Sequence, residues 1–202
     1  MARIILVRHG KTDWNQELRI QGGSSDTPLN EEGRYQAEKL ALRLSRCNIQ
    51  AIYSSPLKRA FETAQMIAKH HNIEVVVEKS LREIEAGDME GLTSAELGVR
   101  FSELLTRDGV SYRVPKGESL VDLQQRSWNF IQSINRVHVR SELVVVSHYF
   151  AVLTILCSAL MVPLSHITRF RLSTGCINIL NLDEKEARLE LFNDTGYIAK
   201  FP

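Results

Sequence analysis

The sequence predicts an α/β protein with helices on both faces of a sheet. Short runs of aliphatic residues, typical of buried strands, alternate with longer segments in which apolar residues recur at helical spacing. The first run, residues 3–7, is followed by Arg8, His9 and Gly10, a triplet poorly suited to a turn and well suited to binding an anion at a strand end. The length of 202 residues is sufficient for one domain over residues 1–202 with a full core.

Composition and charge argue against several classes of function. The net charge of +1 leaves no excess for a large basic face, so nucleic acid is not an expected partner. The longest apolar run, residues 149–157, is too short to cross a bilayer, and residues 4–7 are too short for a signal peptide. Cys47, Cys157 and Cys176 are widely spaced and lie in or beside apolar segments, which indicates free thiols and not disulfides or a metal site. We therefore expect a cytoplasmic protein with no membrane partner.

The first half of the chain predicts one further strand and two helices. Asn30 is the expected N-cap of a helix. Residues 51–53 predict a second strand, and Ser55-Pro56 predicts the start of a helix that runs to about His70. Arg59 then falls in the first turn of that helix, where an anion would bind. The apolar face of the helix after Asn30 consists of Ala37, Leu40, Ala41 and Leu44.

The second half predicts the remaining elements of the sheet and its cover. In order, they are a strand at 75–77, a carboxylate-rich loop at 81–91, helices at 93–107 and 118–137, a strand at 143–147, a helix at 149–160, and strands at 176–182 and 188–192 joined by a turn at 183–186. Residues 93–116 are expected to include a lid or substrate-facing insertion. The inner side of the helix at 118–137 is predicted to contain Leu120, Leu123, Phe130, Ile131, Ile134 and Val137.

Two strand ends carry the chemistry that the pattern favours. His9 follows the first strand and His148 follows the strand at 143–147, while Arg8 and Arg59 lie at a strand end and a helix start. A lone histidine after a strand is more often structural than catalytic. Two such histidines with two arginines instead favour a phosphate site, because guanidinium groups offer a planar fork of donors and an imidazole nitrogen can be a nucleophile.

Several motifs resemble those of the histidine phosphatase superfamily, also called the phosphoglycerate mutase-like family. They are Arg8-His9-Gly10 within residues 6–15, residues 26–33, residues 54–64, Leu81-Arg82-Glu83 followed by Glu90-Gly91, residues 117–120, and Ser147-His148. They cover most of residues 3–148, and their combination is specific. The resemblance implies a three-layer α/β/α sandwich with a mostly parallel central sheet, and catalysis through a phosphohistidine with no metal and no cofactor.

The resemblance also implies roles for individual residues. His9 is the nucleophile, while Arg8, Arg59 and His148 hold the phosphoryl oxygens and Asn15 adds a hydrogen bond. We expect the nearby cations to lower the pKa of His9, and its other ring nitrogen to donate to a carbonyl or carboxylate.

Glu83 is implied as the general acid and then the general base. Spacing alone does not single it out, because Glu85, Asp88 and Glu90 lie close by; most of these are expected to be solvated or structural.

Two positions depart from the family pattern. Tyr149 stands where relatives often have glycine. This change keeps a backbone N–H for phosphate and adds a bulky phenol to the pocket. Lys11 replaces a common glutamate, and the sequence assigns it no role. Specificity is expected to depend on residues 20–27, including Gln21 and Gly22, on residues 93–116, and on Tyr149.

The leading hypothesis is a metal-independent phosphomonoesterase acting on a small phosphorylated metabolite such as α-ribazole phosphate, phosphoserine or a sugar phosphate. One alternative is a phosphoglycerate mutase, although mutases of this family tend to carry shielding insertions for which 202 residues leave little room. Another is a non-catalytic phosphate-binding regulatory module, although this chain keeps both His9 and Glu83. A nucleotide-binding Rossmann protein is disfavoured because no G-x-G-x-x-G follows the first strand. The sequence leaves a homodimer open.

Overall fold

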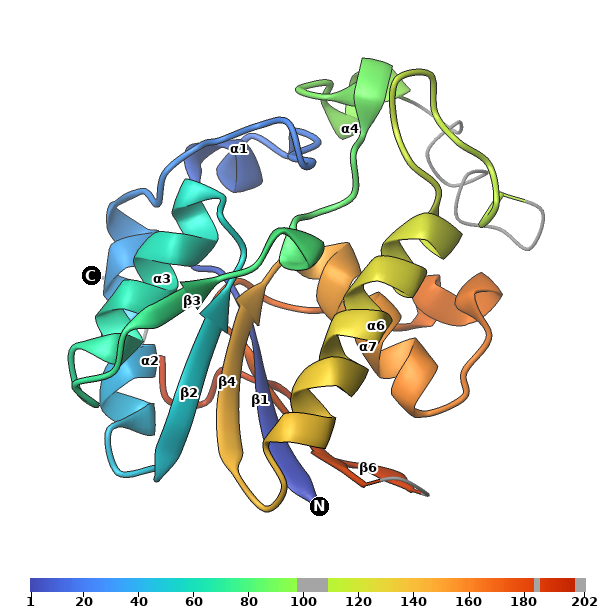
Figure 1. The fold of residues 1–202 in the computed structure, drawn as a ribbon. Coiled ribbons are helices and arrows are strands. Elements are labelled where there is room, and N and C mark those ends of the chain that lie inside the picture. The colour runs from blue at the N-terminus through green and yellow to red at the C-terminus, as the bar shows by residue number, and fades with distance from the viewer. Residues whose placement is uncertain (98–108, 184–185, 199–202) are drawn as a thin grey trace.

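A computed structural model of the chain describes residues 1–97, 109–183 and 186–198 (Figure 1). Its strands are β1 (Ala2–Arg8), β2 (Ile49–Ser54), β3 (Val75–Val77), β4 (Glu142–Ser147), β5 (Ile177–Leu182) and β6 (Ala187–Asp194). Its α-helices are α1 (Asp13–Gln16), α2 (Glu31–Leu44), α3 (Lys58–Ala68), α4 (Ser94–Leu97), α6 (Leu120–Val137) and α7 (Tyr149–Ala159). Short 3₁₀ turns are η1 (Lys79–Leu81), η2 (Gly87–Met89) and η3 (Leu164–Arg169).

Within the described ranges the six strands form one sheet in the order β3-β2-β4-β1-β5-β6. β4 pairs in parallel with both β1 and β2, and β2 pairs in parallel with β3. β5 and β6 form an antiparallel hairpin, and β5 pairs antiparallel with β1. The carboxyl ends of β1, β2 and β4 therefore meet at one edge of the sheet.

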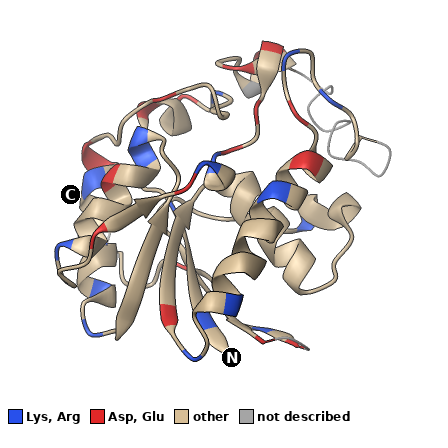
Figure 2. Ribbon diagram, in the orientation of Figure 1, with Lys and Arg blue, Asp and Glu red and all other residues tan. Residues whose placement is uncertain are grey.

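Helices cover both faces of this sheet, which confirms the three-layer α/β/α prediction (Figure 1). Successive strand residues point to opposite faces. In β1, Ile5 and Val7 pack with α2 and α3, whereas Ile4 and Leu6 pack with α6 and α7. Lys and Arg are interspersed with Asp and Glu along the described ribbon (Figure 2). In this part of the chain no helix combines the length and apolarity that a membrane span requires.

Several element boundaries and faces differ from the sequence prediction. α6 begins at Leu120 because Ser119 caps it, with the Ser119 hydroxyl accepting from the Asp122 N–H at 3.2 Å. Val137 was expected on the inner side but is 77% exposed, because it is the last residue of the helix. Phe130 is only partly buried and packs edge-on against Tyr53.

The other differences concern α3, α4 and the cysteines. α3 begins at Lys58 with no side-chain cap, so Ser55 is not its N-cap as predicted; the Ser55 hydroxyl bonds His148 and also accepts the Leu57 N–H. Of the helix predicted at 93–107, α4 accounts for the first residues, and 98–108 lie outside the described residues. The three cysteines are free, as predicted, with Cys157 and Cys176 buried and Cys47 half-buried.

Two residues of α6, one buried and one exposed, test this packing. Ile131 is 0% exposed, so Ile131→Ala should lower the free energy of unfolding by about 2–5 kcal/mol through lost burial and the cavity left behind. Val137→Ala should change it by less than about 0.5 kcal/mol, because that side chain is exposed. Urea unfolding of both variants checks this; equal losses would show that the face of α6 is assigned wrongly.

Candidate active site

Two histidines lie side by side because β1 and β4 are parallel neighbours. Arg8 pairs in register with Ser147, and the His9 N–H donates to the Ser147 carbonyl oxygen at 3.0 Å, which extends the ladder by one residue. His9 and His148 then leave the sheet together, with ring centroids 5.1 Å apart. Both are buried, so the structure brings together the two residues that the sequence placed at strand ends.

The ring of His9 is fixed in one tautomer. Its Nδ1 lies 2.7 Å from the Gly10 carbonyl oxygen, which can only accept, so Nδ1 carries the proton and Nε2 keeps a free lone pair. Burial, then the charges of Arg59 and Arg8, hold the pKa of His9 well below its ordinary value. The sequence predicted this direction of the pKa shift from the cations alone, and it predicted a carbonyl or carboxylate partner, which proves to be the carbonyl. At neutral pH the ring is therefore a neutral imidazole, with its one proton on Nδ1.

Gly10 itself has a packing role that its sequence does not reveal. A Cβ at this position would lie 2.4 Å from the Gly33 carbonyl oxygen, at the start of α2. The glycine therefore allows close packing between the strand end and α2.

His148 is held by a serine from the neighbouring strand end. Its Nε2 lies 2.8 Å from the Ser55 hydroxyl, which also accepts the Leu57 N–H at 3.3 Å. With that lone pair occupied, the hydroxyl proton can be donated to Nε2, which would place the ring proton on Nδ1. Nδ1 is buried with no hydrogen-bond partner among the described residues. Burial and the charge of Arg59 lower the pKa of His148 far below its ordinary value.

The two arginines are bound by backbone carbonyl groups. Arg59 donates to the carbonyl oxygens of Ser25 at 2.5 Å and Gly22 at 3.0 Å, and Arg8 donates to that of Leu172 at 2.5 Å. Within the described ranges neither guanidinium has a carboxylate within ion-pair distance, and each has a buried Nε without a partner. Burial lowers the pKa of Arg59 to about 10, so it remains charged at neutral pH.

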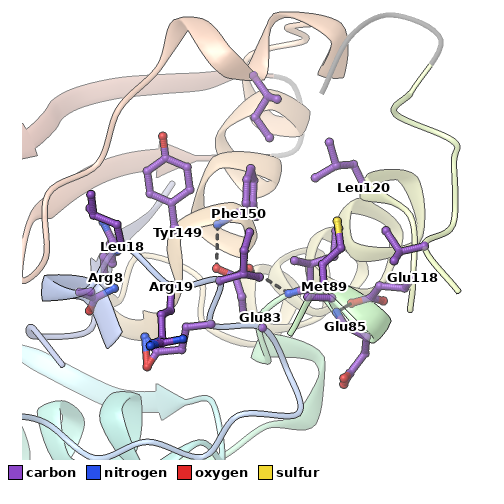
Figure 3. A pocket seen from close by; sticks show the side chains of 18 of the residues that line it. Arg8, Leu18, Arg19, Glu83, Glu85, Met89, Glu118, Leu120, Tyr149 and Phe150 are labelled. Carbon is purple, nitrogen blue, oxygen red and sulfur yellow. Dashed lines mark hydrogen bonds between the residues drawn. The ribbon is translucent and has the colours of Figure 1, made fainter. Parts of the chain in front are cut away.

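Glu83 is a buried carboxyl group positioned by helix α7. It accepts from the N–H groups of Ile84 at 2.9 Å, Phe150 at 3.1 Å and Ala151 at 3.3 Å (Figure 3). Burial raises its pKa above the ordinary value, and these N–H groups with Arg59 and Arg8 oppose that shift only in part. The group can therefore carry a proton at a higher pH than an exposed glutamate.

Most of the predicted site residues line one cavity of about 820 Å³. Those that line it are Arg8, His9, Asn15, Gln21, Gly22, Glu83 and Tyr149. Arg59 and His148 do not line the cavity; both are fully buried. The ring of Tyr149 stacks on the Arg8 guanidinium at 5.0 Å, and its hydroxyl donates to the Phe170 carbonyl oxygen at 3.1 Å. This phenol is thus part of the wall, as its bulk predicted.

The polar residues Lys11, Asn15 and Gln21 have local partners as well. Asn15 accepts the Thr12 N–H at 3.1 Å and so closes the capping box of α1, while Gln21 bonds the Thr12 hydroxyl at 3.0 Å. Lys11, for which the sequence gave no role, pairs with Glu32 at 2.6 Å.

Sequence reasoning missed Arg126, which holds the segment that carries Glu83. From α6 it donates to the carbonyl oxygens of Ser80 at 2.7 Å, Arg82 at 2.8 Å and Glu83 at 2.9 Å, and it pairs with Glu118. Its position among the helical residues of α6 gives no signal for this role. The only clue was that Glu118 belongs to the motif at residues 117–120.

The neighbouring carboxylates are structural, as the sequence suggested for most of them. Glu90 accepts the N–H groups of Gly22 and Ser25, both at 2.9 Å, and so shapes the loop that Arg59 also holds. Glu85 pairs with Arg82, and Asp88 pairs with Lys116, both at 2.9 Å.

A neutral imidazole, one buried and one half-buried guanidinium group and a protonatable carboxyl group at one sheet edge suit phosphoryl transfer. Comparison with known families agrees, since residues 4–195 match the histidine phosphatase superfamily (branch 1). The chain belongs to this superfamily, which confirms the predicted resemblance and the class of phosphoric monoester hydrolase.

Three similar proteins illustrate the range of the family. Phosphoserine phosphatase 1 of Hydrogenobacter thermophilus is 33% identical over 204 residues, covering 100% of this chain and 96% of the relative. Phosphoglycerate mutase-like protein 4 of Arabidopsis thaliana is 42% identical over 153 residues, covering 73% of this chain and 66% of the relative. A phosphoserine phosphatase structure from Entamoeba histolytica, in complex with phosphoserine, superposes with a TM-score of 0.90 at 28% identity, covering 98% of this chain and 100% of that one.

The low pKa of His9 predicts a pH-dependent stability. Below about pH 6.5 the imidazole takes up a proton in the unfolded chain but not in the folded one, so acid favours unfolding. Between pH 7.5 and 5.5 this should remove roughly 1 kcal/mol from the free energy of unfolding. His9→Asn keeps a donor for the Gly10 carbonyl but cannot titrate.

Urea unfolding of wild type and His9→Asn at the two pH values isolates the imidazole. The raised pKa of Glu83 shifts stability in the opposite direction, but it is common to both proteins and cancels in the comparison. The wild type should lose roughly 1 kcal/mol more than the variant. Equal losses would mean that His9 is protonated in the folded state.

Proposed function

We propose that the protein hydrolyses the phosphate monoester of a small metabolite through a phosphohistidine on Nε2 of His9. The observation that carries the proposal is the tautomer of His9. Its Nδ1–H donates to the Gly10 carbonyl oxygen, which leaves Nε2 unprotonated. His9 lines the same cavity as Arg8 and Glu83. Family membership supports a phosphatase, and the proposed chemistry requires no cofactor.

The first step forms the phosphoryl-enzyme. Arg8 and Arg59 offset the charge of the non-bridging oxygens, and His148 can add a donor through Nδ1. Nε2 of His9 attacks phosphorus, the bond to the bridging oxygen breaks, and that oxygen takes the proton of Glu83. Because burial raises the pKa of Glu83, the required protonated form is accessible.

The second step returns the enzyme to its starting state. The Glu83 carboxylate removes a proton from a water molecule, whose oxygen attacks phosphorus as the P–N bond breaks. Inorganic phosphate leaves, His9 regains its lone pair, and Glu83 is protonated again. The same residue therefore acts first as acid and then as base.

The comparisons support phosphate monoesters as the class of substrate, and the particular ester is a separate proposal. α-Ribazole phosphate, phosphoserine and sugar phosphates are the candidates that the sequence motifs suggest. Similarity to phosphoserine phosphatases supports the second, and similarity to a phosphoglycerate mutase-like protein keeps phosphoryl transfer between hydroxyl groups as the second function to test. The free cysteines fit the reducing cytoplasm as the place of action.

Phosphate release from a panel of phosphorylated metabolites near neutral pH tests the proposal. With a chelator present, at least one ester should be hydrolysed, and the activity should vanish in His9→Ala because the nucleophile is removed. Acid-labile, base-stable labelling of the wild type by the active ester should accompany turnover. Isomerisation of phosphoglycerate without phosphate release would instead identify a mutase, and silence in both assays would favour the binding module.

Glu83→Gln tests the acid and base steps separately. Hydrolysis of alkyl phosphates should fall by about 10²–10⁴-fold, because an alkoxide cannot leave without a proton. 4-Nitrophenyl phosphate should still give a burst of one nitrophenolate per enzyme, followed by slow turnover, because that leaving group needs no proton whereas the second step needs the base. Wild-type turnover of alkyl esters by this variant would remove Glu83 from the mechanism.

A further inference from the structure

The cavity is far larger than a phosphoryl group requires. Its volume of about 820 Å³ lies in the range of pockets that enclose ligands of drug size. The phosphoryl group must sit against His9 and Arg8 at one end. The remaining space is therefore available to the alcohol from which phosphate is removed.

Glu83 sets the direction in which that alcohol extends. The leaving oxygen has to lie at the Glu83 carboxyl, so the carbon attached to it enters the part of the cavity beyond this residue. In Figure 3, Met89 and Leu120 lie on the side of Glu83 away from Arg8, and Phe150 stands beside Glu83. With Ile84 they form an apolar wall (Ile84, Met89, Leu120 and Phe150) drawn from the 81–91 segment and from helices α6 and α7.

Among the residues that the structure describes, two carboxylates near the apolar wall already have partners. Glu85 pairs with Arg82 at 2.9 Å, and Glu118 pairs with Arg126 at 2.5 Å. Among the cations that line the cavity farther out, Lys11 pairs with Glu32 and Arg19 pairs with Glu17. Arg171 also lines the cavity and is exposed.

We propose that the alcohol of the natural substrate is uncharged and carries an aromatic or alkyl group that packs on the apolar wall. This inference rests on the proposed phosphatase function and narrows its substrate class. A compact leaving group with both a carboxylate and an ammonium, such as serine, would leave the wall uncovered. It would also have to compete for the side chains that are already paired.

Three esters of primary alcohols test this proposal, because their leaving groups need the same protonation. They are 2-phenylethyl phosphate, ethyl phosphate and phosphoserine. The value of kcat/KM for 2-phenylethyl phosphate should exceed that for each of the other two at least about tenfold, because only its ring is removed from water by the wall.

Met89→Gln locates the effect, because it replaces an apolar wall residue with a neutral polar one of similar size. Its kcat/KM for 2-phenylethyl phosphate should fall at least about threefold, while that for ethyl phosphate stays within twofold. Met66→Gln is the control, since Met66 is also half-buried but lies on α3 and does not line the cavity.

The outcomes separate the two proposals. His9-dependent hydrolysis of all three esters with equal kcat/KM, or equal effects of Met89→Gln on the phenylethyl and ethyl esters, overturns the apolar substrate and leaves the phosphatase function standing. A preference for phosphoserine overturns it too, and would direct attention to Arg171 as the carboxylate ligand. Hydrolysis of none of the panel or test esters overturns the phosphatase function and this inference with it.

Discussion

Buried positive charge without a carboxylate partner is the constraint on which the rest of the site depends. In the described part of the chain, the guanidinium groups of Arg8 and Arg59 are held by the carbonyl oxygens of Leu172, Gly22 and Ser25. Carbonyl dipoles solvate a cation but do not neutralise it, and removing a cation from water is costly. Part of that cost appears as the lowered pKa of Arg59, at about 10. An anion bound at the sheet edge would offset the rest, so the free protein is organised for a ligand with negative charge.

The same burial prepares the acid and the base in opposite senses. Desolvation penalises whichever form of a group is charged, so it lowers the pKa of His9 and raises that of Glu83. Arg59 and Arg8 strengthen the first shift and oppose the second. The result is an unprotonated nucleophile in the same cavity as a carboxyl group that holds its proton to a higher pH than an exposed glutamate does. Burial in one shared cavity therefore shifts the pKa values of His9 and Glu83 toward the protonation states that their proposed roles require.

The sequence predicts the parts of this arrangement that are local or periodic. Strand ends, the Asn30 cap and the buried face of α2 follow from short-range rules, and the parallel pairing of β1 with β4 then brings His9 and His148 together. The missed features depend on contacts between distant segments. Ser55 has the sequence context of an N-cap, but its hydroxyl is bound to His148, 93 residues away. Arg126 resembles any polar residue of an amphipathic helix until the carbonyl groups of Ser80, Arg82 and Glu83 are placed around it. Val137 shows the converse: the helix ends where the sequence predicted, but helical spacing does not reveal that its last residue is exposed.

The acid is positioned from one layer of the fold and the nucleophile from the other side of the sheet. The Glu83 carboxylate is held by the first turn of α7, and its backbone is held by Arg126 of α6, so its place depends on the helix layer that packs on Ile4 and Leu6. Arg59 belongs to α3, and the carbonyl group that fixes the His9 ring belongs to Gly10, which packs on α2. These elements lie with Ile5 and Val7 on the opposite face. The relative position of His9 and Glu83 therefore depends on strands β1 and β4, which lie between the two helix layers, and not on any single loop. A rigid pair of parallel strands is what allows a proton and a phosphoryl group to be handled in the same cavity by residues from both layers.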